Sequence, residues 1–174
     1  MQTSRRSFLK IGVLGAITLA AGGALYRTLH TPAPPGRFVL DGAARAVLTA
    51  VIPAMIGSML PADPRARALA IAATTERVEG AIHGLPLATQ KEVQDLFGLL
   101  ALAPARRFLA GVPQDWAQAS PQQIGGFLDS WRHHRFAMLQ TAYLAMHDLI
   151  IGAWYADPST WAAIGYPGPI KELS

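Results

Sequence analysis

The 174-residue sequence contains no cysteine. Without thiols the chain cannot form a disulfide, bind zinc or an iron–sulfur cluster through thiolates, or attach haem through a C-x-x-C-H motif. Motifs for nucleotide and acyl chemistry are also missing, because the sequence has no P-loop, no G-x-G-x-x-G and no G-x-S-x-G. The sequence therefore supports no dinucleotide site, phosphate cradle or hydrolase triad.

The first 40 positions contain no acidic residue, although they hold five of the 15 lysines and arginines. From residue 38 to the end, ten basic and eleven acidic residues nearly cancel, so the overall net charge of +4 comes from the N-terminal segment. A protein that binds a phosphate backbone needs a cluster of basic residues on its folded domain. We therefore expect no nucleic-acid partner.

Residues 1–30 have the features of an export signal. A basic head, SRRSFLK at residues 4–10, precedes an apolar run at residues 11–25 that is rich in Ala and Gly. The pattern resembles the twin-arginine signal. A membrane anchor is disfavoured because roughly 20 apolar residues are needed to span a bilayer. Cleavage at residues 20–24 and retention as a short tether both stay open. The expected export residues are Arg5, Arg6, Phe8, Leu9 and Lys10.

Residues 31–37, TPAPPGR, form a Pro-rich spacer that favours extended backbone. We expect one folded domain at residues 38–174, since half of the chain is apolar and its length suits a single core. Apolar residues recur at helical spacing in this region, and no stretch alternates in the manner of a strand. The predicted fold is therefore all-α, with about five helices and an irregular C-terminal tail.

Capping residues locate the first two helices. Asp41 is placed to cap the first, in which Pro53 predicts a kink or an end near Val51. Asp63, followed by proline, starts the second helix, which we expect to end near Ile82. The residues expected to face inward from this second helix are Ala68, Ile71, Ala72, Val78 and Ile82.

The next helices are predicted in the same way. Thr89 and Glu92 match a capping box for a third helix, and residues 106–109 suit a short fourth between proline and glycine breakers. Ser120, followed by proline, starts another helix. Its apolar stripe consists of Ile124, Phe127, Leu128 and Trp131.

A long apolar helix is predicted from about Arg135 to Tyr155, either separate from the preceding helix or continuous with it. Its clearly polar residues are few, so it is apolar around most of its circumference, and such helices are usually buried. Glycines and prolines in residues 157–169 predict that the tail after it is not helical. The clearly polar residues of the helix are Gln140, Thr141, His147 and Asp148.

Histidines are the first candidates for chemistry. His133 and His134 are adjacent, and neighbouring residues on a helix point about 100° apart, so we expect no shared metal ion. His147 and Asp148 interrupt the most apolar helix, where we expect each to be paired with another helix by a hydrogen bond or an arginine. Residues i and i+1 do not face each other on a helix. We therefore expect no catalytic dyad from this pair.

The tail at residues 154–169, WYADPSTWAAIGYPGP, holds two Trp, two Tyr and three Pro. Aromatic anchors dominate protein interfaces, so this composition suits a docking surface. A tail that folds back on its own core is equally compatible with the pattern. The residues expected to dock a partner are Trp154, Tyr155, Trp161, Tyr166 and Pro167.

This ending, together with the twin-arginine leader and the cysteine-free helical body, resembles the gluconate 2-dehydrogenase subunit 3 family. The resemblance implies a small subunit of a periplasmic FAD-dependent sugar or alcohol dehydrogenase. It implies a large FAD-bearing partner of the glucose–methanol–choline (GMC) type, often accompanied by a membrane-bound multihaem cytochrome c. It also implies that the small subunit supplies the export signal for a large subunit that lacks one.

The expected function is therefore that of a periplasmic accessory subunit. It would leave the cytoplasm through the twin-arginine translocase, stabilise the flavoprotein and associate with the membrane through its complex. We expect no catalytic, cofactor or metal site in this chain, with FAD held by the partner. The alternative is an independent periplasmic helical enzyme or small-ligand-binding protein that uses the region of His147 and Asp148.

Overall fold

The computed structural model describes residues 36–168 of the chain. The predicted export residues lie outside this range. Within it the fold is all-α, as predicted, with no strand and with six α-helices where about five were expected. The elements are α2 (Gly42–Ile56), η1 (Gly57–Met59), α3 (Pro64–His83), α4 (Leu87–Ala101), α5 (Ala103–Phe108), η2 (Trp116–Gln118), α6 (Pro121–Arg132), α7 (Ala137–Tyr155) and η3 (Pro158–Ile164), where η denotes a 3-10 helix.

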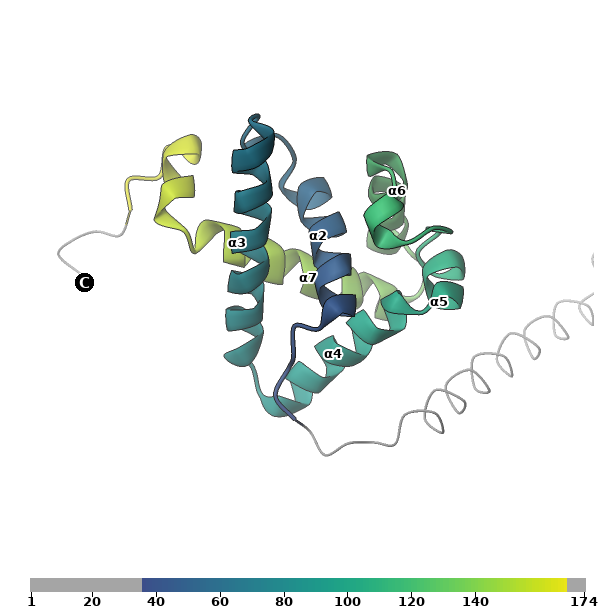
Figure 1. The fold of residues 1–174 in the computed structure, drawn as a ribbon. Helices are drawn as coiled ribbons and strands as arrows, with labels where there is room; N and C mark the ends of the chain where they lie inside the picture. Colours follow the sequence, from purple (N-terminus) through teal and green to yellow (C-terminus); the bar gives the residue numbers. More distant parts are fainter. Residues whose placement is uncertain (1–35, 169–174) are drawn as a thin grey trace, which may run out of the picture. The chain divides into compact units, whose positions relative to one another are not determined.

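Helix α2 lies at the centre of the domain and contacts α3, α4, α6 and α7 (Figure 1). The segment Gly42–Met59 is long and apolar enough to cross a membrane by length and composition. Its apolar side chains, however, pack into the hydrophobic core formed with the surrounding helices. These observations make α2 the core helix of the domain. The buried residues of α2 are Ala44, Val47, Leu48, Val51, Ile52 and Ile56.

Of the two outcomes predicted for Pro53, a kink or an end near Val51, the end does not occur, because α2 continues through Pro53 to Ile56. A proline inside a helix costs about 3 kcal/mol. Ile52 and Ile56 on either side of it are both buried, and burial of one such side chain contributes about 1.5–3 kcal/mol. The helix ends instead at Gly57, whose positive φ of 62° suits glycine and whose N–H donates to the Pro53 carbonyl.

Three helix starts follow the sequence prediction. The carboxylates of Asp41 and Asp63 each accept a hydrogen bond from the backbone N–H three residues on, at 2.8 Å. The Ser120 hydroxyl accepts from the Gln123 N–H at 3.2 Å, and the Gln123 side chain accepts from the Ser120 N–H at 2.9 Å. The starts of α2, α3 and α6 are therefore confirmed. The predicted stripe of α6, Ile124, Phe127, Leu128 and Trp131, is buried.

The predicted capping box at Thr89 is wrong, because α4 begins at Leu87. The reason is Gln90, which is buried and fully engaged with neighbouring backbone. Its side chain accepts from the Phe38 N–H at 3.0 Å and donates to the Leu85 carbonyl at 2.8 Å. These bonds hold the turn between α3 and α4, and the N-cap of α4 is Pro86, three residues before the predicted cap at Thr89.

Helix α3 buries threonines that the sequence did not predict to face inward. Thr74 and Thr75 are buried, and their hydroxyls donate to the carbonyls of residues 70 and 71 at 2.8 and 2.9 Å. With their hydroxyls bonded, the rest of these side chains can pack in the core. Ala68 and Ala72, predicted to face inward, are exposed. Among the other predicted positions, Val78 and Ile82 are buried and Ile71 is half-buried.

Helix α7 buries only one side, so the prediction that it is buried around its circumference is wrong. Met138 is 73% exposed and Leu144 is 54% exposed. Among the described elements, the helix packs against α2, α3, α6 and, near its end, η3. It is separate from α6, because residues 133–136 interrupt the helical path. The buried residues of α7 are Leu139, Met146, Ile150, Ala153 and Trp154.

Candidate docking surface

The tail after α7 is helical where the sequence predicted an irregular segment. Pro158 occupies the first turn of η3, a position where its missing N–H needs no partner. Asp157 caps this helix, since its carboxylate accepts from the Ser159 N–H at 2.9 Å. Gly165, with a φ of 70°, ends it in the left-handed conformation. Proline and glycine therefore bound this short helix and do not prevent it.

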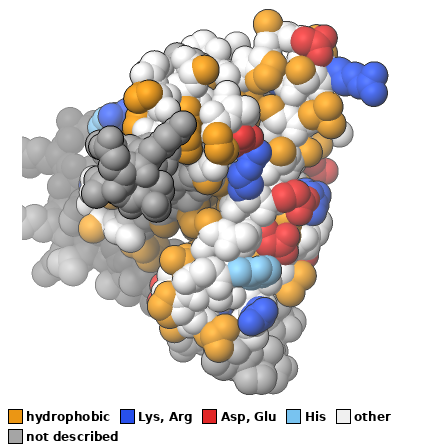
Figure 2. Space-filling view, turned by 90° about the vertical axis from the view of Figure 1, so that its left-hand side faces the viewer, with side chains coloured by type: hydrophobic (Ala, Val, Ile, Leu, Met, Phe, Trp, Pro, Cys, Tyr) orange, Lys and Arg blue, Asp and Glu red, His pale blue; other side chains and the backbone are white. Residues whose placement is uncertain are grey.

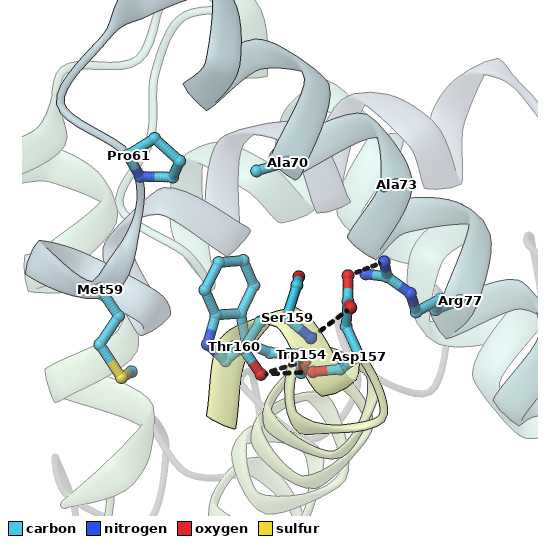
Figure 3. Close-up of a pocket in the computed structure, with 9 residues that line it drawn as sticks. All are labelled: Met59, Pro61, Ala70, Ala73, Arg77, Trp154, Asp157, Ser159 and Thr160. Carbon is cyan, nitrogen blue, oxygen red and sulfur yellow. Dashed lines mark hydrogen bonds and ion pairs between the residues drawn. The ribbon is translucent and has the colours of Figure 1, made fainter. Parts of the chain in front are cut away.

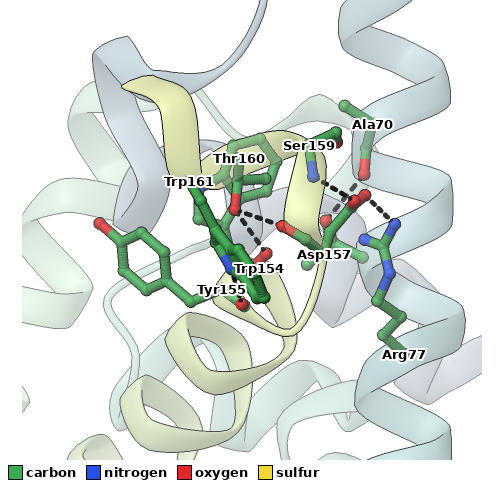
Figure 4. Close-up of polar contacts among 9 residues, drawn as sticks. Ala70, Arg77, Trp154, Tyr155, Asp157, Ser159, Thr160 and Trp161 are labelled. Atoms are coloured by element: carbon green, nitrogen blue, oxygen red, sulfur yellow. Dashed lines mark hydrogen bonds and ion pairs between the residues drawn. The ribbon is translucent and has the colours of Figure 1, made fainter. Parts of the chain in front are cut away.

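The start of the tail is tied to α3. Arg77 forms an ion pair with Asp157, and the two side chains are about a third and a quarter exposed (Figure 4). Hydrogen bonds from Ser159, followed by the positive charge of Arg77, lower the pKa of Asp157 from its usual value. The carboxylate is therefore charged at neutral pH and fixes the first turn of η3 to the middle of α3.

Further hydrogen bonds fold the tail against the end of α7. The Thr160 hydroxyl donates to the carbonyls of Trp154 and Asp157 at 3.2 and 2.8 Å. The Trp161 Nε1–H donates to the Tyr155 carbonyl at 2.7 Å (Figure 4). The Tyr166 ring then packs edge-on against the Trp161 indole, with 5.2 Å between ring centroids. The tail thus folds back on the domain, which was one of the two arrangements that its sequence allowed.

The five predicted docking residues differ in how far this arrangement exposes them to solvent. Trp154 is only 7% exposed and belongs to the core. Tyr155 and Trp161 are half-buried, and the Tyr155 hydroxyl contacts the Met59 sulfur at 3.2 Å. Tyr166 is 46% exposed and Pro167 is exposed. The accessible surface of the tail is therefore its distal part, where docking stays a prediction.

Sequence reasoning missed two residues of this surface. Ile164 is 50% exposed although it is apolar, and it lies in the same short helix as Trp161. Arg77 was not singled out, because nothing in the local sequence links it to a carboxylate 80 residues away. The run of tail aromatics was the one available signal, and it indicated the region but not the contacts that hold it.

A pocket of about 200 Å³ lies where α3, the segment after η1 and the tail meet (Figure 3). Its walls are mostly apolar, and Trp154 contributes its indole ring. The ion pair of Arg77 and Asp157 stands at one side. The lining residues are Met59, Pro61, Ala70, Ala73, Arg77, Trp154, Asp157, Ser159 and Thr160.

The second candidate region, around His147, differs from the prediction. His147 Nδ1 and Asp148 Oδ1 are 3.0 Å apart, so the expectation that adjacent side chains cannot meet is wrong. Both side chains are accessible to solvent, where free rotamers let them approach. The His147 ring stacks on Tyr143, with 5.9 Å between centroids. In the described residues neither His147 nor Asp148 has the expected partner on another helix, and neither lines the pocket.

The histidines at the end of α6 lie on the surface. His133 pairs with Asp129 one turn earlier, at 3.1 Å, and its side chain is mostly exposed. Within residues 36–168 no three His, Asp or Glu side chains are grouped in a way that could hold a metal ion. On the face seen in Figure 2, acidic and basic side chains are interspersed and form no cluster of one sign among the described residues.

Comparison with known proteins found no match for this chain among family models, curated proteins or solved structures.

Proposed function

We propose that this chain is a non-catalytic accessory subunit of a periplasmic FAD-dependent dehydrogenase. It stabilises the large flavoprotein subunit and carries its twin-arginine export signal. The partner is a dehydrogenase of the GMC type, which holds the FAD and oxidises a sugar or alcohol. A membrane-bound multihaem cytochrome c accepts the electrons and places the complex at the membrane.

The observation that carries this proposal is the folded aromatic tail. Hydrogen bonds and an ion pair hold its proximal half, so its distal half is presented on a fixed support. Ile164 and Tyr166 are each about half exposed on that support. Rigid, partly exposed aromatic and aliphatic side chains are the residues that anchor protein interfaces, because little conformational entropy is lost when they bind.

The sequence of the leader supports the proposed export role independently of the tail. Arg5 and Arg6 stand in the arrangement of a twin-arginine signal, and that pathway exports proteins already folded. The pathway is commonly used by proteins that load a cofactor before export. A small subunit that binds the folded flavoprotein in the cytoplasm can carry it through the translocase.

The export role is tested by replacing Arg5 and Arg6 with lysine in the native host. Lysine keeps the charge of the leader, so only recognition by the translocase is altered. We expect both this chain and the dehydrogenase activity to be retained in the cytoplasm. Normal periplasmic activity in the double variant would contradict the escort role. An Arg27→Lys variant makes the same replacement at a leader arginine outside residues 4–10 and serves as the control.

The alternative is an independent periplasmic enzyme or small-ligand-binding protein that uses His147 and Asp148. Their 3.0 Å contact is the one observation in its favour, since an oriented imidazole can act in acid–base chemistry. This reading predicts activity or ligand binding by the isolated chain that is lost in His147→Ala. The matched control is His133→Ala, which removes another exposed histidine that is also paired with an aspartate.

A further inference from the structure

The pocket between α3 and the tail exists because its α3 wall is made of small residues. Ala70 and Ala73 line it, and the next lining residue on α3 is Arg77, one turn further on (Figure 3). Larger side chains at the two alanines would fill the space against Trp154. The pocket therefore follows from the sequence of α3 and does not depend on a movement of the tail.

Trp154 brings an unused hydrogen-bond donor to this pocket. The chain has four tryptophans. Three of them donate their indole N–H to a backbone carbonyl, at Leu100, Leu109 and Tyr155. The Trp154 Nε1–H makes no such bond within the described part of the chain. The residue as a whole is only 7% exposed. The nitrogen is not a fully buried orphan, because in the described residues the one side-chain nitrogen or oxygen that is buried without a partner is Arg106 Nε. A carbonyl oxygen from another molecule that enters the pocket can therefore accept from this indole N–H.

Arg77 adds donors at the same pocket. Its Nη2 is paired with Asp157 Oδ2, and within residues 36–168 its guanidinium makes no other hydrogen bond. A guanidinium carries five N–H donors, so several stay available to an oxygen atom at the entrance. The Asp157 carboxylate already accepts from Ser159 and Arg77. The site thus combines an apolar interior with unused donors, and it suits an apolar group that carries carbonyl oxygens.

The volume of the pocket limits the size of the group that can bind in it. Pockets for drug-sized ligands and cofactors measure about 300–1,000 Å³, and this one measures about 200 Å³. It is large enough for a single apolar side chain. At protein interfaces such a side chain inserts into a pocket as an anchor, and its own backbone supplies carbonyl oxygens.

We propose that this pocket receives one apolar side chain, such as leucine, methionine or phenylalanine, from the partner subunit. The backbone carbonyls next to that side chain accept hydrogen bonds from Trp154 Nε1–H and Arg77. The inference rests on the proposed function for the identity of the partner. It extends the docking surface from the exposed end of the tail to the junction of the tail with α3.

A first experiment tests the pocket without the partner. N-acetyl-L-leucinamide, which presents one apolar side chain and two carbonyls, is titrated into the full-length chain while the four indole N–H signals are followed by NMR. We expect a saturable shift of the Trp154 signal with a Kd on the order of 1 mM, as befits a ligand of this size. The signals of Trp116 and Trp131 should stay unchanged. N-acetyl-L-serinamide should bind at least several-fold more weakly.

The matched variants are Ala73→Leu and Ala72→Leu. Both alanines lie on exposed positions of α3, but only Ala73 lines the pocket. Ala73→Leu should abolish the Trp154 shift, whereas Ala72→Leu should keep it. Absence of a shift in the unaltered chain, or an equal shift in both variants, would overturn the inference.

A second experiment uses the complex isolated from the native host. Ala73→Leu should raise the Kd for the flavoprotein by about tenfold or more, because the anchor is displaced, and Ala72→Leu should leave it unchanged. A flavoprotein that binds both variants equally overturns the pocket inference and leaves the proposed function supported. A chain that binds the leucinamide but co-purifies with no flavoprotein contradicts the proposed function, while the pocket remains supported as a side-chain site.

Discussion

Arg77, in the middle of α3, forms an ion pair with Asp157, the residue that caps η3. This contact joins parts of the chain that are 80 residues apart. It stands at one side of the pocket and also fixes the first turn of the tail. We connect two features with partner binding, the pocket and the aromatic tail. Both are therefore held by the ion pair of Arg77 and Asp157.

Replacement of Asp157 with alanine should loosen the tail. The change removes both the ion pair and the helix cap, and loss of a cap alone costs about 1 kcal/mol. We expect the free energy of unfolding to fall by about 1–2 kcal/mol and the Trp161 indole N–H to exchange faster with solvent. The control Asp148→Ala removes an exposed aspartate of α7 and should change stability by less than about 0.5 kcal/mol. Equal effects of the two changes would contradict the role of Asp157.

The stabilising effect of Asp157 should depend on pH in a defined direction. Its pKa is lowered in the folded protein, so its contribution is fully present above the ordinary aspartate value of about 3.9 and is lost as the pH falls through the lowered pKa. The stability difference between the unaltered chain and Asp157→Asn should therefore be constant near neutral pH and shrink in strong acid. Urea unfolding at about pH 7 and about pH 3 measures it, and a difference that grows in acid would refute the assignment.

The two sides of α7 should respond differently to the same kind of truncation. Ile150 is completely buried, and replacement with alanine should destabilise the domain by about 2–5 kcal/mol. Leu144 is 54% exposed on the same helix, and its replacement with alanine should change stability by less than about 0.5 kcal/mol. Chemical denaturation of both variants measures these values. A large loss for Leu144→Ala would show that the outer side of α7 is packed.

Tyr166 should contribute to partner binding more than to folding. It is 46% exposed at the end of the tail, so Tyr166→Ala should weaken the complex by about 1 kcal/mol or more, roughly fivefold in Kd. Phe136→Ala, which removes a similarly exposed aromatic ring before α7, is the control and should bind normally. Unchanged affinity in Tyr166→Ala would mean that the end of the tail lies outside the interface.

The helix starts that depend on neighbouring residues could be predicted from the sequence. Asp41, Asp63 and Ser120 cap helices through bonds that span three residues, so the local pattern is sufficient. The start of α4 could not be predicted, because the bond from the Phe38 N–H to Gln90 spans 52 residues. The continuation of α2 through Pro53 has the same kind of cause, since burial of distant helices against it outweighs a local preference.

The candidate site was predicted less completely than the fold. The aromatic composition of the tail indicated the region, but the burial of Trp154 and the role of Arg77 depend on how α3 and α7 pack. The pairing of His147 with Asp148 was missed for another reason. Backbone geometry separates the two positions on the helix, whereas the rotation of exposed side chains brings them together.

The central claim, that this chain is the partner of a flavoprotein, is tested most directly by isolating it from its native host. The full-length chain, tagged after Ser174 so that the leader stays free, is purified from periplasm and membranes, and its absorption spectrum is recorded. We predict a flavin spectrum and a much larger co-purifying chain with dehydrogenase activity. A colourless chain that purifies alone from both fractions would contradict the account.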